Sequence, residues 1–145
     1  MKDGVVVFVG HRNEWQCLNL KDEIYKIFEQ LIIEGYTTFY DGAHGAFDKL
    51  CMNVVCELKK KYPHIKLILI STHYKHNKLL PFCYSYSIFP PLECVYPKAK
   101  ITERNKWMVD NCDIIVCHIE NTSATSGAYR TIKYARKKNK NIIEI

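Results

Sequence analysis

The 145-residue chain lacks several features that would place it in particular classes of protein. Its uninterrupted apolar runs, such as VVVFV and IIV, are far shorter than the roughly 18 residues that a membrane-spanning helix needs. The first residues, MKDGVVVF, show no signal-peptide layout, and no repeat, low-complexity tract or linker follows. We therefore expect a single globular domain over residues 1–145, in the cytoplasm and without a membrane partner.

Cysteine and histidine give little support for a metal site. The seven cysteines are an odd number, form no CxxC pair and fall mostly in apolar segments such as LCMNVVCEL and CDIIVC. We expect them to be buried free thiols, because cysteine behaves as a small hydrophobic residue in protein cores. His73 and His76 have no cysteine or carboxylate partner at ligand spacing. The sequence therefore predicts no metal site and no cofactor.

The chain has more basic than acidic residues. It contains 21 lysines and arginines and 15 acidic residues, which gives a net charge of +6. Several of the lysines lie in ELKKKYPHIK and YARKKNKN, where two expected helices end. Cations at helix C-termini complement the helix dipole, so this excess is weak support for nucleic-acid binding. We expect no nucleic-acid partner.

Strand and helix patterns alternate along the chain. Continuous apolar runs predict strands at residues 4–10, 37–40, 65–71, 112–119 and 141–145. Amphipathic periodicity predicts helices at residues 20–35, 46–63, 101–111 and 126–139. Residues 72–99, which hold four of the five prolines, predict a long irregular connection with a short strand at 93–96. Apolar strands separated by helices predict a Rossmann-like α/β fold, with a mainly parallel sheet covered by helices on both faces.

Glycines gather where three predicted strands end. Four of the six glycines lie there, namely Gly10, Gly42, Gly45 and Gly127. Glycine lets backbone amides approach a ligand closely, and a helix N-terminus adds free N–H groups that attract an anion. Ligands of such sheets bind beyond the carboxyl ends of the strands, so this pattern favours a phosphate-bearing ligand at that edge.

Three of the four arginines lie near the same edge. Arg12 follows the first strand, Arg104 lies early in the third helix, and Arg130 lies in the first turn of the last helix. The planar guanidinium group suits phosphate or carboxylate, while an ordinary surface ion pair is the alternative for each.

Three acidic residues have candidate roles at this edge. Asp41 ends the second strand, where a carboxylate can accept hydrogen bonds from ribose hydroxyls. Asp48 lies in the first helical turn after it, and we expect it mainly to complement the helix dipole. Glu103 is a candidate for holding a ribose or acting as a general base, and a surface ion pair is its alternative.

Four stretches together resemble a known family. VGHR, DGAHGAFDKLCMNVVCELKKKYPHIKLILI, ERNKWMVDNCDIIVC and TSGAYRTIKYARKKNKNIIEI are similar, in order and spacing, to the YpsA-like branch of the SLOG superfamily. That superfamily also contains DNA-processing protein A and the "lonely guy" phosphoribohydrolases. The resemblance covers nearly the whole chain and weakens across residues 72–99. It implies a single Rossmann-like SLOG domain that binds a nucleotide or nucleotide-derived ligand at its strand ends, and at least a homodimer.

The resemblance also assigns positions. Of the candidate ligand-binding residues, it matches Gly10, His11, Arg12, Gly42, Gly45, Arg104, Asn105, Ser126 and Gly127. Asp41 is added because it ends the second strand, and Thr125 because its hydroxyl could meet a phosphate. Ser126 replaces the first glycine of the family's glycine pair, and Ala128 replaces its usual threonine. Thr131 stands where the phosphoribohydrolases carry a catalytic glutamate. Threonine cannot serve as a carboxylate, so hydrolysis would need Glu103 instead.

Three functional hypotheses follow. The first is a sensor or sequestering protein for a nucleotide, such as an ADP-ribose or cyclic nucleotide derivative. The alternative is a hydrolase or transferase at the N-glycosidic bond of a nucleoside or nucleotide, with Glu103 as the candidate catalytic residue. The third and weakest is a single-stranded nucleic-acid binder that uses lysines and tyrosines of residues 72–99.

Overall fold

A computed structural model of the chain describes residues 4–11, 19–43, 45–72, 83–120 and 126–145. In these residues six strands form one parallel sheet in the order β4-β3-β2-β1-β5-β6. The strands are β1 (Gly4–Gly10), β2 (Tyr36–Asp41), β3 (Lys66–Ile70), β4 (Tyr86–Ile88), β5 (Ile114–His118) and β6 (Asn141–Glu144). The helices are α1 (Lys21–Ile33), α2 (Ala46–Lys61), α3 (Lys100–Asp110) and α4 (Gly127–Lys137), with a short 3-10 helix η2 (Pro97–Ala99) before α3. The predicted Rossmann-like class is confirmed.

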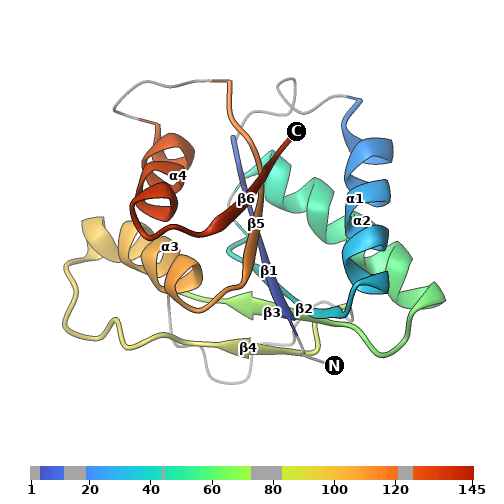
Figure 1. Ribbon diagram of the computed structural model, residues 1–145. Helices are drawn as coiled ribbons and strands as arrows, with labels where there is room; N and C mark the ends of the chain where they lie inside the picture. Colours follow the sequence, from blue (N-terminus) through green and yellow to red (C-terminus); the bar gives the residue numbers. More distant parts are fainter. Residues whose placement is uncertain (1–3, 12–18, 44, 73–82, 121–125) are drawn as a thin grey trace.

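Helices cover the sheet on both faces. Figure 1 shows α1 and α2 on one side of the sheet and α3 and α4 on the other. Along β1, Val6 and Phe8 belong to the core under α1 and α2, whereas Val7 and Val9 belong to the core under α3 and α4. Successive side chains of a strand point to opposite faces, so a strand that is covered twice must be apolar throughout. This requirement explains the uninterrupted run VVVFV.

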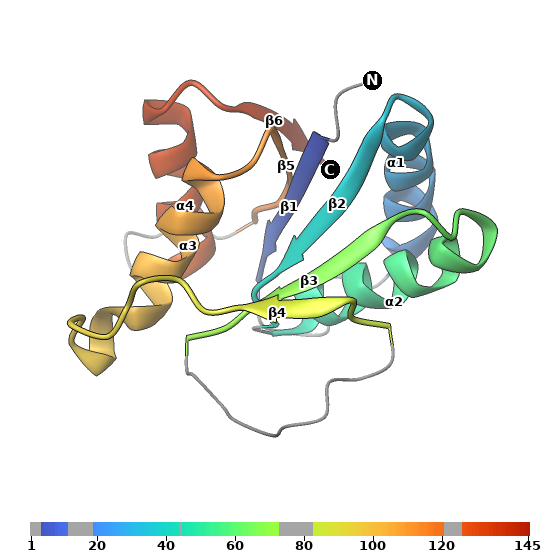
Figure 2. The same cartoon turned by 90° about the horizontal axis from the view of Figure 1, so that it is seen from below.

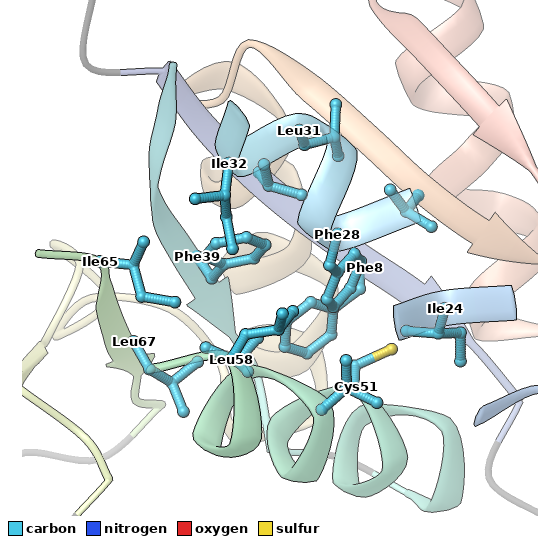
Figure 3. Close-up of a cluster of buried hydrophobic side chains, with 14 of the residues drawn as sticks. Phe8, Ile24, Phe28, Leu31, Ile32, Phe39, Cys51, Leu58, Ile65 and Leu67 are labelled. Carbon is cyan, nitrogen blue, oxygen red and sulfur yellow. The ribbon is translucent and has the colours of Figure 1, made fainter. Parts of the chain in front are cut away.

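The core beneath α1 and α2 is built around aromatic rings. Phe28 lies between Phe8 and Phe39, with ring centroids 5.9 and 5.1 Å apart, and Ile24 and Leu58 pack beside them (Figure 3). Each of these five side chains is at most 1% exposed. Burying one such side chain contributes about 1.5–3 kcal/mol, so this layer holds β1, β2 and α2 firmly in place.

The sheet edge differs from the sequence prediction. The strand predicted at residues 93–96 is wrong, because these residues form turns, and the edge strand β4 lies earlier, at Tyr86–Ile88 (Figure 2). Its side chains are half-buried or exposed, so no apolar pattern marks it. Backbone hydrogen bonds place it instead: Ser85 N–H donates to the Leu67 carbonyl at 2.8 Å, and Ser71 N–H to the Ile88 carbonyl at 2.9 Å.

The described cysteines are free thiols. The buried ones are Cys51, Cys83, Cys112 and Cys117, as predicted, whereas Cys56 is half-buried and Cys94 is exposed. Cys17, His73 and His76 lie outside the described residues. Across the described ranges, no three His, Cys, Asp or Glu side chains are placed to hold a metal ion. No helix among the described residues is long and apolar enough to cross a membrane.

Candidate functional site

The strand order reverses between β1 and β5. From β1 the chain builds outward through β2 and β3 to β4, and it then returns to add β5 and β6 on the other side of β1. At the carboxyl end of this junction, Gly10 of β1 pairs with His118 of β5. In parallel α/β sheets, ligands bind in the crevice at such a reversal.

Gly10 has a packing role at this junction. A Cβ atom at Gly10 would lie 2.2 Å from Cγ of Phe47, so the Phe47 ring of α2 fills the space beside the glycine. The Phe47 N–H also donates to the carbonyl of His11 at 3.2 Å. The missing side chain thus allows α2 to approach the end of β1.

His11 connects β1 to the segment after β5. Its Nε2 accepts a hydrogen bond from the Glu120 N–H at 2.7 Å, and the ring is buried. Burial lowers the pKa of His11, and nearby His118 lowers it further, while Glu120 acts in the opposite direction. A neutral ring with an unprotonated Nε2 is the form that this hydrogen bond requires.

Asp41 is an internal carboxyl group beneath the turn that follows β2. It is 1% exposed, and it accepts hydrogen bonds from the Ala43 N–H at 2.7 Å and from the Tyr84 hydroxyl. Burial raises the pKa of Asp41 to about 6, while hydrogen bonds from Tyr84 and Ala43 and the charge of Arg104 oppose the rise. The structure therefore places this predicted ribose acceptor where it organises the turn.

The two glycines of this turn serve different purposes. Gly45 has φ 103° and immediately precedes α2, so it adopts a backbone conformation that other residues rarely take. Gly42 is not in that conformation. A Cβ atom on Gly42 would lie 3.0 Å from the Cζ and Nη2 atoms of Arg104, so the glycine leaves room for the guanidinium group.

Arg104 joins the two helical layers across the end of the sheet. From α3 its Nη1 donates to the carbonyl of Gly42 at 2.6 Å, and Nη2 and Nε donate to Oδ1 of Asn105 at 3.2 and 3.4 Å. Burial lowers the pKa of Arg104, while Asp48 and Asp41 raise it. Asp48, which is also buried, therefore acts as a countercharge to Arg104 as well as lying in the first turn of α2.

The start of α4 is capped and open on one side. The Ser126 hydroxyl accepts a hydrogen bond from the Tyr129 N–H at 3.2 Å. Thr131 donates to the carbonyl of Gly127 at 2.8 Å and accepts from Nδ2 of Asn105 at 3.3 Å, which ties α4 to α3. Apart from the neighbouring residues and the helix's own backbone, no heavy atom of the described residues lies within 4 Å of where a Cβ on Gly127 would be, so this side of the first turn is open among them.

A pocket of about 370 Å³ lies between α3 and α4. From η2 and α3 it is lined by Lys98, Ile101, Thr102, Asn105 and Lys106. From α4 it is lined by Gly127, Arg130, Thr131 and Tyr134. These lining residues include three cations and no acidic residue, so the pocket favours an anionic ligand.

The pocket contains only some of the predicted site residues. Asn105 and Gly127 line it, and Ser126 adjoins it as the cap of α4. Asp41 and Arg104 instead form hydrogen bonds within the fold, Asp41 with Tyr84 and Arg104 with the carbonyl of Gly42. Arg12 and Thr125 lie outside the described residues.

Glu103 lies outside the pocket lining. Its carboxylate pairs with Nζ of Lys106 at 3.5 Å, with 42% of its side chain exposed. This is the surface ion pair that the sequence left open as the alternative to a catalytic role.

Sequence reasoning left Lys98 and Lys106 out of the site. Nothing in their local sequence separates them from surface lysines, because only the packing of α3 against α4 places them in one pocket with Arg130. Arg130 carried a detectable signal: an arginine near a helix N-terminus opposes the helix dipole and needs a compensating partner.

Comparison with known proteins adds one distant relative. The chain is similar to the uncharacterized SPbeta prophage-derived protein YoqJ of Bacillus subtilis (strain 168). The two are 26% identical over an alignment of 143 residues, which covers 83% of this chain and 82% of the relative. No protein-family model matches the sequence. Membership of the SLOG superfamily therefore stays a prediction.

Proposed function

We propose that this protein binds a nucleotide or nucleotide-derived ligand, such as an ADP-ribose or cyclic nucleotide derivative, at the carboxyl edge of the sheet. Bound there, the ligand would be sensed or sequestered rather than converted. The observation that carries the proposal is the pocket between α3 and α4, which combines the first turn of α4 with three cationic side chains. Its volume of about 370 Å³ lies within the roughly 300–1,000 Å³ that is usual for small-molecule sites.

The first turn of α4 supports an anionic group in the ligand. The N–H groups of Gly127 and Ala128 donate no hydrogen bond to any described residue, and no acidic side chain lies in this turn. Free N–H groups at a helix N-terminus attract phosphate through hydrogen bonding and through the helix dipole. Arg130 adds a full positive charge at the same end of α4.

The composition of the pocket favours binding over hydrolysis. Cleavage of an N-glycosidic bond needs a carboxylate beside the anomeric carbon, and no described lining residue is acidic. Thr131, at the position of the phosphoribohydrolase glutamate, is buried, and its hydroxyl bonds to Gly127 and Asn105. Glu103 would have to leave Lys106 before it could act.

Native mass spectrometry of the purified protein with a panel of nucleosides and nucleotides tests this proposal. A retained ligand of unaltered mass is the expected result, whereas release of a free base would identify a glycosidase. The same spectra test whether the chain forms the homodimer or higher homo-oligomer that we also propose. Absence of binding across the panel would refute the proposed function.

Two variants test whether a ligand that binds the protein does so in this pocket. Gly127→Val adds a branched side chain at a position where the described residues outside the helix backbone leave open space, so the fold should tolerate it while nucleotide binding weakens. Glu103→Gln should not weaken binding if the protein only binds, and should abolish base release if Glu103 is catalytic. Circular dichroism confirms that each variant is folded.

A further inference from the structure

The pocket lies in the part of the chain that carries the positive charge. Residues 97–140 contain ten lysines and arginines but only four acidic residues, whereas the rest of the chain contains eleven of each. The whole surplus of +6 therefore belongs to the segment that forms η2, α3, β5 and α4. Figure 1 shows α3 and α4 together on one face of the sheet.

The three cations of the pocket differ in their present partners. Within the described residues, the side chains of Lys98 and Arg130 form no ion pair or hydrogen bond. Lys106 pairs with Glu103 at 3.5 Å, but both side chains are more than 40% exposed. Solvent weakens such an exposed pair, so an incoming anion can displace the carboxylate. All three cations are thus available to a ligand.

Two of the three cations lie where a positive charge is unfavourable unless an anion is bound nearby. Lys98 lies just before α3, and Arg130 lies in the first turns of α4, so both are near the positive ends of helix dipoles. Without an anion, cations at these ends are unfavourable to the fold. An anion lying between α3 and α4 would neutralise the side chains and the helix ends together.

The number of charges indicates the class of ligand. One phosphate monoester carries about 1.5 to 2 negative charges at pH 7, which leaves a positive excess beside three cations. A chain of two or more phosphates removes that excess. From this we infer that the groove between α3 and α4, lined by Lys98, Lys106 and Arg130, binds a chain of two or more phosphates. As the phosphate subsite of a nucleotide, it rests on the proposed function and selects diphosphate ligands over cyclic monophosphates.

The one aromatic ring of the described pocket lining is already engaged. Ammonium groups of Lys106 and Lys138 lie 5.6 and 5.5 Å from the centroid of Tyr134, and its hydroxyl donates to Asp110 at 2.9 Å. Even after Lys106 turns to the ligand, a nucleobase stacked there would have to displace the ammonium group of Lys138. The groove therefore receives the phosphate chain, and the nucleoside lies outside it.

Isothermal titration calorimetry of the full chain at one salt concentration tests the inference. The probes are orthophosphate, pyrophosphate and tripolyphosphate, together with adenosine mono-, di- and triphosphate. Pyrophosphate and the diphosphate should bind at least about tenfold more tightly than orthophosphate and the monophosphate, because charge-assisted hydrogen bonds are added. Arg130→Ala should weaken diphosphate binding about tenfold or more.

Two further variants provide matched controls. Lys137→Ala removes a charge of the same sign from an exposed position of α4 outside the pocket, and should change affinity less than about twofold. Glu103→Gln frees Lys106 and should strengthen diphosphate binding.

The possible results separate this inference from the proposed function. Equal affinity for mono- and diphosphate, unaffected by Arg130→Ala, would overturn the phosphate-chain subsite and leave nucleotide binding in place. Binding of tripolyphosphate alone, sensitive to Arg130→Ala, would support the subsite and refute the nucleotide. No binding of any probe would refute both. A separate titration uses single-stranded oligonucleotides of two lengths at several salt concentrations. Affinity that grows with length, falls steeply with salt and depends on Arg130 would assign the groove to nucleic acid instead.

Discussion

The carboxyl group of Asp41 should make the stability of the fold depend on pH between 7 and 5. The group lies beneath the turn after β2, with the Tyr84 hydroxyl and the Ala43 N–H as its donors. Burial favours its protonated form, whereas those donors and the charge of Arg104 favour its ionised form. The substitution Asp41→Asn keeps the shape and an acceptor oxygen but removes the titration.

The size of the effect follows from the two pKa values of the group. Burial raises the pKa of Asp41 from 3.8 to about 6 in the folded protein. The folded state then binds the proton more tightly than the unfolded state does. The contribution of Asp41 to the free energy of unfolding is therefore full below pH 3.8 and is lost as the pH rises through 6. From pH 7 to pH 5 this contribution increases by about 1.3 kcal/mol.

Urea unfolding of the wild type and of Asp41→Asn at pH 5, 6 and 7 measures this contribution. His11 acts in the opposite direction, because burial lowers its pKa, but it is present in both proteins and cancels in their difference. The free energy of unfolding of the wild type minus that of the variant should rise by about 1.3 kcal/mol from pH 7 to pH 5. A constant difference would mean that Asp41 does not titrate in this range. A difference that falls toward pH 5 would mean that Arg104 and Tyr84 outweigh burial, and either result refutes the reasoning.

Three further substitutions test the contacts around the site. Tyr84→Phe removes a donor to Asp41, so urea unfolding should show a loss of about 1–3 kcal/mol, and NMR titration a further rise in the pKa of Asp41; an unchanged pKa would contradict the hydrogen bond. Gly10→Ala places a Cβ atom 2.2 Å from Phe47 and should lower the free energy of unfolding by at least about 1–3 kcal/mol, whereas a neutral result would exclude the tight contact. Ser126→Ala removes the cap of α4 and should cost about 1 kcal/mol, which Ser126→Asp should restore; failure of that rescue would count against capping.

The sequence was sufficient to predict the positions of the helices and strands that bury many apolar side chains. Strand β1 shows this clearly, because Val6 and Phe8 on one face and Val7 and Val9 on the other leave no polar position in its centre. Helix α2 follows a similar logic, since its apolar spacing and Pro63 predicted its extent. Such elements are stabilised by their own side chains, so composition and periodicity identify them.

The edge strand β4 could not be located in this way. Its side chains at Tyr86 and Ser87 are exposed, and what stabilises it is hydrogen bonding to the backbone of β3. Every residue except proline offers the same backbone groups, so the sequence does not show which three residues of a long connection pair with the sheet. The apolar and aromatic letters at 93–96 gave a false signal, because those residues form turns instead.

The sequence by itself determined the fold class and the edge of the sheet at which polar residues gather, because these depend on periodicity and on chain direction. The tertiary structure decided what the residues at that edge do. It paired Asp41 with Tyr84, 43 positions away, and placed Arg104 on the carbonyl of Gly42, 62 positions away. It also brought Lys98 and Lys106 to the same pocket as Arg130. These contacts arise from the packing of separate elements, and that packing depends on the volume and shape of the whole core rather than on any local pattern.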